Sequence, residues 1–141
     1  MSRIRPSWDQ YFMDIAKVVA TRSPDDKTQV GCVVVDINNR IVSTGYNGTP
    51  PGFDDSFIDW FSKDKMPFIL HAEMNSILYA KQELTDCILY CTLGPCLDCL
   101  KHIKQVGIRK VIYLEDCKMI IEAKNLAKCF NVELIKFVGV V

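Results

Sequence analysis

The sequence predicts an α/β fold in which helices cover both faces of a mixed sheet. From Val30 onwards, segments rich in β-branched and aromatic residues alternate with segments of helical periodicity, which is typical of a sheet with helices packed on it. Only the short turn Ile37–Asn39 separates the first two expected strands, which predicts an antiparallel hairpin. With 141 residues, the chain is expected to form one domain, residues 1–141, with a substantial core.

One helix is expected before the sheet. Ser7 to Gln10 has the pattern of a capping box, so this helix should start near Trp8 and end at the turn Ser23–Asp26. The turn formers of residues 45–52 predict a loop, and residues 54–65 are weakly helical. Strands are expected at residues 30–35, 40–44, 87–92, 109–114 and 132–138, and helices at 71–84, 96–106 and 118–130.

Composition and charge exclude several classes of protein. The 17 basic and 17 acidic residues balance, so the chain has no electrostatic footprint for nucleic acid or for an anionic membrane. No apolar run approaches the ~20 residues of a membrane span, and the short, basic start of the chain lacks the pattern of a signal peptide. The seven cysteines, an odd number, are expected to be reduced thiols in the cytoplasm.

The residues with the clearest chemistry are His71-Ala72-Glu73 and Pro95-Cys96-Leu97-Asp98-Cys99. Cys96 and Cys99 lie one helical turn apart, so both sulfurs can face one metal ion, and His71 supplies a third ligand from another expected helix start. Three protein ligands leave the fourth position of zinc open for water, which is the catalytic arrangement. Glu73 is then free to move protons for that water.

Simpler interpretations compete with this one. A lone C-x-x-C is often a redox pair or part of a structural zinc site. A structural zinc needs a fourth ligand, for which Cys87 and Cys91 are the nearest candidates in sequence. We expect Cys32, Cys87, Cys91, Cys117 and Cys129 to be small buried apolar residues. Glu73 could also be only a carboxylate that stabilises the first turn of its helix, and His102 is expected to be solvated.

At these residues the chain resembles the zinc-dependent cytidine/deoxycytidylate deaminase superfamily, whose signature is H-x-E…P-C-x-x-C. The resemblance extends in order from about Arg22 to Leu114, and the loop Gly45-Tyr46-Asn47-Gly48-Thr49-Pro50 resembles deoxycytidylate (dCMP) deaminases in particular. It implies a three-layer α/β/α, cytidine-deaminase-like fold around a five-stranded mixed sheet. It also implies hydrolytic deamination of dCMP to dUMP and ammonia, with dCTP, converted to dUTP, as a second substrate. This reaction would supply pyrimidine deoxynucleotides for thymidylate synthesis.

The resemblance implies a role for each site residue. Zinc held by His71, Cys96 and Cys99 would activate a water for attack on C4 of cytosine, with Glu73 as proton shuttle. The backbone of Ala72 would meet the ring carbonyl, and Asn47 would contact the deoxyribose. From the residues alone, Ser23 and Lys27 in the turn before the first strand are candidate phosphate contacts, or else parts of a solvated turn. Tyr113 could stack on the base or belong to the core.

Family members are commonly hexamers that dCTP activates and dTTP inhibits, so the resemblance implies a homo-oligomer, with Tyr46, Asn47, Gly48 and Thr49 as effector contacts. Some members carry a second, structural zinc held by a cysteine in the turn before the first strand. Here that turn reads Ser23-Pro24-Asp25-Asp26-Lys27, so we expect one zinc per chain. The sequence leaves two other functions open: a deaminase of RNA bases or of a free nucleoside or base, and a non-catalytic module stabilised by zinc.

Overall fold

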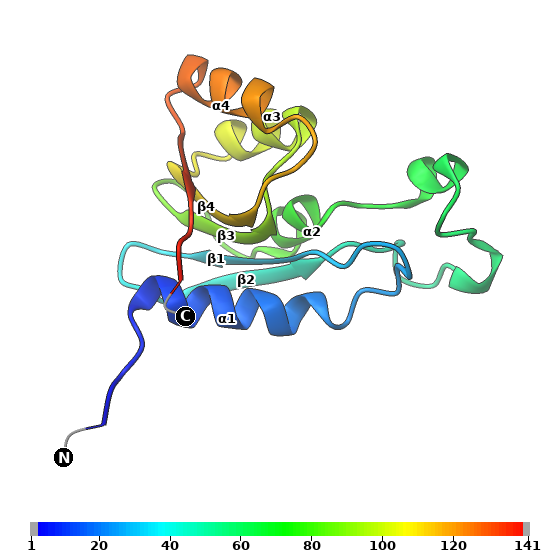
Figure 1. Ribbon diagram of the computed structural model, residues 1–141, viewed down its shortest axis with the longest axis horizontal. Coiled ribbons are helices and arrows are strands. Elements are labelled where there is room, and N and C mark those ends of the chain that lie inside the picture. Colours follow the sequence, from blue (N-terminus) through cyan, green and yellow to red (C-terminus); the bar gives the residue numbers. More distant parts are fainter. Residues whose placement is uncertain (1–2, 140–141) are drawn as a thin grey trace.

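The central sheet has five strands in the order β2-β1-β3-β4-β5 in the computed structural model, which describes residues 3–139 (Figure 1). Strand β1 (Gly31–Val35) lies antiparallel to both β2 (Ile41–Tyr46) and β3 (Ile88–Leu93). Strands β4 (Lys110–Glu115) and β5 (Glu133–Lys136) continue from β3 in parallel. The predicted α/β class and mixed sheet are therefore confirmed.

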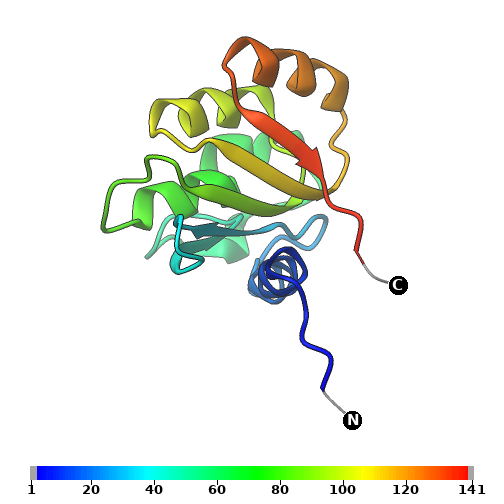
Figure 2. The same cartoon turned by 90° about the vertical axis from the view of Figure 1, so that its left-hand side faces the viewer.

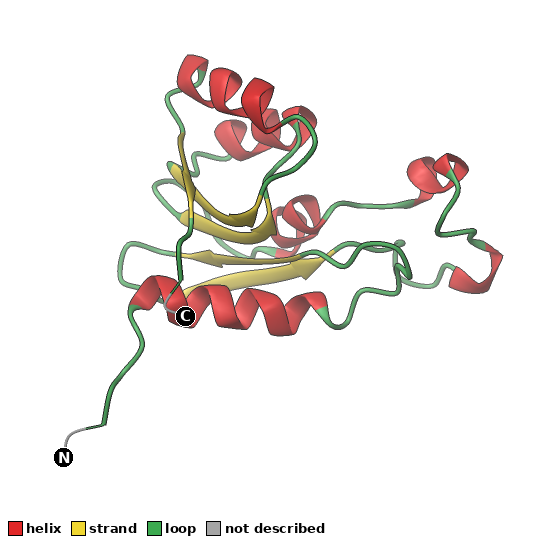
Figure 3. Ribbon diagram, viewed as in Figure 1, coloured by secondary structure: helices red, strands yellow, loops and turns green. Residues whose placement is uncertain are grey.

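The helices form a layer on each face of this sheet. Helix α1 (Trp8–Ala20) covers one face, and α2 (Ala72–Tyr79), α3 (Leu97–Gln105) and α4 (Ile120–Cys129) cover the other (Figures 2 and 3). Alternate residues of the central strands face opposite sides, so each face has its own apolar core. Val33 of β1 packs in the core on the α1 side, whereas its neighbour Cys32 packs on the side of the other three helices.

Two segments differ from the sequence prediction. The helix expected to reach Leu84 ends at Tyr79, because the chain leaves the helix to bury Leu84 in the core just before β3. The weakly helical stretch at 54–65 forms two short 3-10 helices, η1 (Asp55–Phe57) and η2 (Lys63–Phe68), which extend away from the sheet (Figure 1). The expected cap of α1 is present, since the Ser7 hydroxyl accepts a hydrogen bond from the Gln10 amide at 3.1 Å.

Helix α2 is held unusually close to the sheet by Gly45 of β2. A Cβ atom at this position would lie 2.5 Å from the Ser76 amide nitrogen and 2.6 Å from the Ala72 carbonyl oxygen. Only glycine permits this approach of backbone to backbone. The first turn of α2, which carries Glu73, is therefore fixed directly against the sheet.

In the part of the chain that the structure describes, none of the helices has the length and apolar character needed to span a bilayer. Four residues of the expected single domain lie outside the described residues: Met1, Ser2, Val140 and Val141. The first two also belong to the N-terminal stretch for which no signal peptide is expected.

Candidate metal centre and active-site cavity

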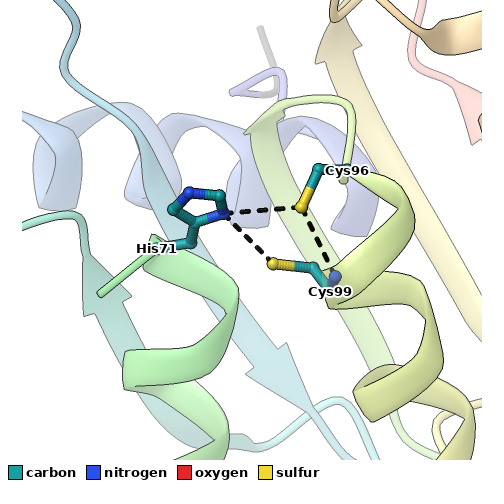
Figure 4. Close-up of side chains that lie close together, drawn as sticks. All are labelled: His71, Cys96 and Cys99. Carbon is teal, nitrogen blue, oxygen red and sulfur yellow. Dashed lines mark hydrogen bonds between the residues drawn. The ribbon is translucent and has the colours of Figure 1, made fainter. Parts of the chain in front are cut away.

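Three potential metal ligands converge from the starts of two helices. His71 is the residue before the first turn of α2, and Cys96 holds the same position at α3, with Cys99 one turn further on. Figure 4 shows the His71 ring pointing between the two sulfurs. The His71 Nδ1 atom lies 3.3 Å from Cys99 Sγ and 3.5 Å from Cys96 Sγ. The sequence-predicted ligand set is thus brought together, although its members are up to 28 residues apart.

These distances match the edges of a zinc tetrahedron. A nitrogen at about 2.0 Å and a sulfur at about 2.3 Å from one tetrahedral zinc lie about 3.5 Å from each other. Among the described residues, no fourth His, Cys, Asp or Glu side chain joins the group. Cys87 and Cys91 therefore do not complete a closed structural site, and the residues present fit a zinc ion with one open position.

Hydrogen bonds within the group determine which ligands carry protons before metal binds. A hydrogen bond from Cys99, together with His71, lowers the pKa of Cys96 to about 4, so this sulfur is already a thiolate at neutral pH. The bond to Cys96, with burial, raises the pKa of Cys99. The same thiolate raises the pKa of His71. Cys96 also accepts the Cys99 backbone N–H at 3.4 Å and so caps α3.

Glu73 lies beside this group in the first turn of α2. Its side chain is only 4% exposed, and it lines a cavity of about 200 Å³ together with His71, Ala72 and Cys96. Ala72 is the first residue of α2, so its amide has no acceptor within the helix and is available to a ligand. The cavity thus brings together a metal-binding group, a carboxylate and a backbone donor.

A second group of sulfurs lies beneath Glu73. Its Oε1 atom is 3.4 Å from Cys91 Sγ and 3.6 Å from Cys32 Sγ. The two sulfurs are 2.7 Å apart, whereas two thiolates on one tetrahedral zinc lie about 3.8 Å apart. This group does not fit a second zinc ion, and its contacts are hydrogen bonds between thiols and a carboxylate.

Loops form the opposite wall of the cavity. Asn47 lines it, and its side chain also holds the loops together: Oδ1 accepts from the Val30 amide at 2.9 Å and Nδ2 donates to the Thr28 carbonyl at 2.9 Å. Asp25 is 3% exposed and pairs with Lys65 at 2.8 Å. The Asp25 carboxylate also accepts the Lys27 and Thr28 amides. One aspartate therefore ties the turn at 23–28 to η2.

The two candidate phosphate contacts lie outside this cavity. The Ser23 hydroxyl donates to the Asn47 carbonyl oxygen at 2.8 Å and borders a neighbouring hollow instead. Lys27 is exposed, and only its backbone is engaged by Asp25. The lysine that does line the cavity is Lys65, which sequence reasoning missed because the contact spans 40 residues.

Of the two alternatives for Tyr113, the structure agrees with the core position, and two cysteines differ from expectation. Tyr113 is fully buried and does not line the cavity, so it presents no ring face for a base to stack on. Cys129 is exposed, because it lies at the end of α4 on the outer side, and Cys117 is half-buried at the cavity. Cys32, Cys87 and Cys91 are buried as predicted, and His102 is exposed.

Comparison with known proteins agrees with this geometry. The family model "Cytidine and deoxycytidylate deaminase zinc-binding region" matches residues 6–115. A probable deoxycytidylate deaminase of Caenorhabditis elegans is 46% identical over 112 residues, which cover 76% of this chain and 57% of that protein. The human deoxycytidylate deaminase is 39% identical over 116 residues, which cover 77% of this chain and 65% of that protein. The chain thus spans about three fifths of the length of these relatives.

Solved structures show the same likeness over whole chains. The dCMP deaminase of cyanophage S-TIM5, solved in complex with dCMP and dUMP, superposes with a TM-score of 0.82 at 29% identity, covering 96% of this chain and 100% of that one. A tRNA:A34 deaminase superposes with a TM-score of 0.63 at 18% identity, which shows a shared fold alone. The match of the family model over most of the sequence makes this chain a member of the cytidine and deoxycytidylate deaminase family, and three potential zinc ligands beside a buried glutamate agree with this membership.

Proposed function

We propose that this chain deaminates dCMP by hydrolysis, giving dUMP and ammonia. The observation that carries the proposal is the cavity in which Glu73 lies beside the His71, Cys96 and Cys99 group. The cyanophage relative supports dCMP as the substrate, because it binds dCMP and dUMP and superposes over nearly the whole of this chain. The sequence identity to several deoxycytidylate deaminases supports the same choice.

Each residue of the cavity has a defined task in this reaction. Zinc, when bound by His71, Cys96 and Cys99, supplies a water that is acidic enough to act as a nucleophile near neutral pH. Glu73 takes the proton of the attacking water and delivers it to ring atom N3. It then moves the remaining proton of that oxygen, which is now bonded to C4, to the amino group, and ammonia leaves as the C4–N bond breaks and the C4 carbonyl forms. The Ala72 amide donates to the ring carbonyl oxygen.

The loop wall binds the sugar and phosphate. Asn47 uses its Oδ1 and one N–H of its amide for Val30 and Thr28, so its second N–H can reach the deoxyribose. The Nζ atom of Lys65 donates to Asp25 and to the Trp60 carbonyl oxygen, and its third N–H remains for the phosphate. Lys65 replaces Lys27 in this role, since it is the lysine that lines the cavity.

Turnover of nucleotides by the zinc-loaded protein tests the proposal. dCMP, dCTP, deoxycytidine and CMP are supplied separately, and the loss of cytosine absorbance and the release of ammonia are followed. We expect dCMP to be the best substrate and Glu73→Gln to lower its turnover by about 10²–10⁴-fold with zinc still bound. If wild-type protein with a full zinc complement deaminates none of the four, the proposal is wrong.

Regulation and assembly are further parts of the proposal. Tyr46, Gly48 and Thr49 border a surface hollow with Asn75 and Tyr79, which supports an effector site separate from the cavity, while Asn47 belongs to the cavity itself. Activity measured against dCMP concentration with added dCTP or dTTP tests this, and light scattering tests the expected homo-oligomer. A cytoplasmic location agrees with the free cysteines, and cell fractionation tests it.

A further inference from the structure

Two buried cysteines face each other directly across strands β1 and β3. Cys32 and Cys91 are register partners in this antiparallel pair, and both are fully buried. Their side chains point to the face that α2 covers, where Gly45 brings the first turn of that helix against the sheet. The side chain above them is that of Glu73, whose Oε1 atom is within hydrogen-bond distance of both sulfurs.

We propose that Cys32 and Cys91 are positioning residues for Glu73: their S–H groups hold the Oε1 oxygen from beneath and leave Oε2 to exchange the proton. Cys91 donates at 3.4 Å, and Cys32 donates at 3.6 Å or through Cys91, whose sulfur is 2.7 Å away. This inference rests on the proposed function, because it assumes that Glu73 is the proton shuttle.

The state of the two thiols agrees with a donor role. Burial raises the pKa of Cys32 and of Cys91, so both carry a proton at neutral pH and can donate it. A glutamate side chain has three rotatable bonds, and fixing them before substrate arrives reduces the cost of reaching the geometry for proton transfer. Apolar residues at these two positions would fill the core equally well but would leave Oε1 without a donor beneath it.

Other roles for this pair agree less well with the structure. Zinc is disfavoured by the 2.7 Å sulfur separation, as described above. A redox switch is disfavoured because buried thiols of raised pKa form little thiolate, which is the species that reacts with oxidants.

Kinetics of alanine and serine variants test the proposal. Each variant of the zinc-loaded enzyme is assayed with dCMP. We expect Cys91→Ala to lower kcat by about tenfold, the effect of losing one hydrogen bond to a charged group, with KM and zinc content unchanged. Cys32→Ala should have a smaller effect. Serine at either position restores a donor and should recover kcat to within about threefold of wild type.

Cys87→Ala is the matched control. Cys87 is buried in the same core and immediately precedes β3, but it does not contact Glu73. We expect this variant to keep the wild-type kcat. The proposal is overturned if Cys91→Ala behaves like Cys87→Ala, or if Cys91→Ser loses as much kcat as Cys91→Ala.

Infrared spectroscopy of the S–H stretch gives a readout that needs no substrate. Bands assigned to Cys32 and Cys91 by their loss in the alanine variants should move to higher frequency in Glu73→Ala, because the acceptor is gone, while the bands of Cys87, Cys117 and Cys129 stay in place. Unmoved bands would overturn the positioning role even in an active enzyme. If the bands move in Glu73→Ala but the wild-type protein does not deaminate dCMP, the contact between the thiols and Glu73 is present and the proposed function is wrong.

Discussion

The two walls of the active-site cavity are built in different ways. The helix-start wall, residues 71–73 and 94–96, takes its shape from backbone: α2 lies against β2 at Gly45, and α3 follows directly from β3. The loop wall, residues 25–30, Asn47 and 65–69, is held by side chains, chiefly the buried Asp25–Lys65 pair and the Asn47 amide.

From this difference we expect the helix-start wall to carry metal binding and proton transfer, and the loop wall to carry substrate binding. In the helix-start wall, a side chain can change without moving the backbone that carries it, provided that the cap of α3 at Cys96 is kept. Such substitutions should remove metal or proton transfer and leave the fold intact. In the loop wall, each polar side chain also supports the backbone around it, so substitutions should cost stability and substrate affinity together. The predictions below test this separation.

The largest effect is expected for Cys96→Ser. Serine keeps an N-cap for α3 but cannot supply the thiolate, so the protein should lose zinc and all measurable turnover while its thermal unfolding temperature without metal stays close to that of the metal-free wild type. Elemental analysis and calorimetry measure these outcomes. Cys129→Ser, at an exposed cysteine on α4, should retain zinc. Full zinc occupancy in Cys96→Ser would remove this cysteine from the ligand set.

Asp25→Asn should give the next largest effect, on stability instead of chemistry. Lys65, of which only 12% of the side chain is exposed, would keep the Trp60 carbonyl oxygen but lose its carboxylate partner, which costs about 3–5 kcal/mol for a largely buried pair. Urea unfolding of the metal-free protein measures this loss. Asp26→Asn is the control, because Asp26 lies in the same turn and is exposed. Equal losses in the two variants would refute a supporting role for the ion pair.

Zinc affinity should fall as pH falls. Cys96 is a thiolate above about pH 4, but Cys99 has a raised pKa and must lose its proton to bind. His71, whose pKa is also raised, must lose one as well when it is protonated. Zinc binding should therefore release about two protons below the pKa of His71 and about one above it. For each proton released, the zinc affinity should fall roughly tenfold for every pH unit of acidification.

Isothermal titration of zinc in buffers of different ionisation enthalpy counts these protons. The helix-start wall alone should produce the pH dependence, so Asp25→Asn should release the same number of protons as wild type. At a pH well below the pKa of a zinc-bound water, which is about 7, three protons per zinc would mean that Cys96 is a thiol in the metal-free protein, against the hydrogen bonding described above.

The smallest effect is expected for Asn47→Ala. Two hydrogen bonds within the loop wall are lost, which should cost about 1–3 kcal/mol of stability and raise the KM for dCMP while zinc content is unchanged. Steady-state kinetics and urea unfolding measure the two effects. An exposed asparagine, Asn38, gives the matched control Asn38→Ala. A change in zinc content without a change in KM would mean that Asn47 supports the helix-start wall and not the loop wall.

The same division explains how much could be predicted from sequence. His71, Glu73, Cys96 and Cys99 were predictable because a strand or loop followed by a helix start is a local pattern, and ligand spacing within a turn is fixed by helix geometry. The side-chain contacts of the loop wall were not predictable, because Asp25 and Lys65 are 40 positions apart in the sequence and meet only in the folded chain. Lys27, a candidate because it lies with Ser23 in the turn before β1, is exposed. The contact of Cys32 with Cys91 depends on strand register across 59 residues.

One sulfur atom links the folding of α3 to metal capture. Because Cys96 Sγ accepts the Cys99 amide, closing the first turn of the helix already brings the two cysteines into binding position, and the entropy of arranging them is lost during folding and not during metal uptake. Zinc should therefore enter and leave a folded protein, at a rate limited by the Cys99 proton and by access through the cavity. A chelator would then yield an inactive but folded enzyme that zinc restores at once.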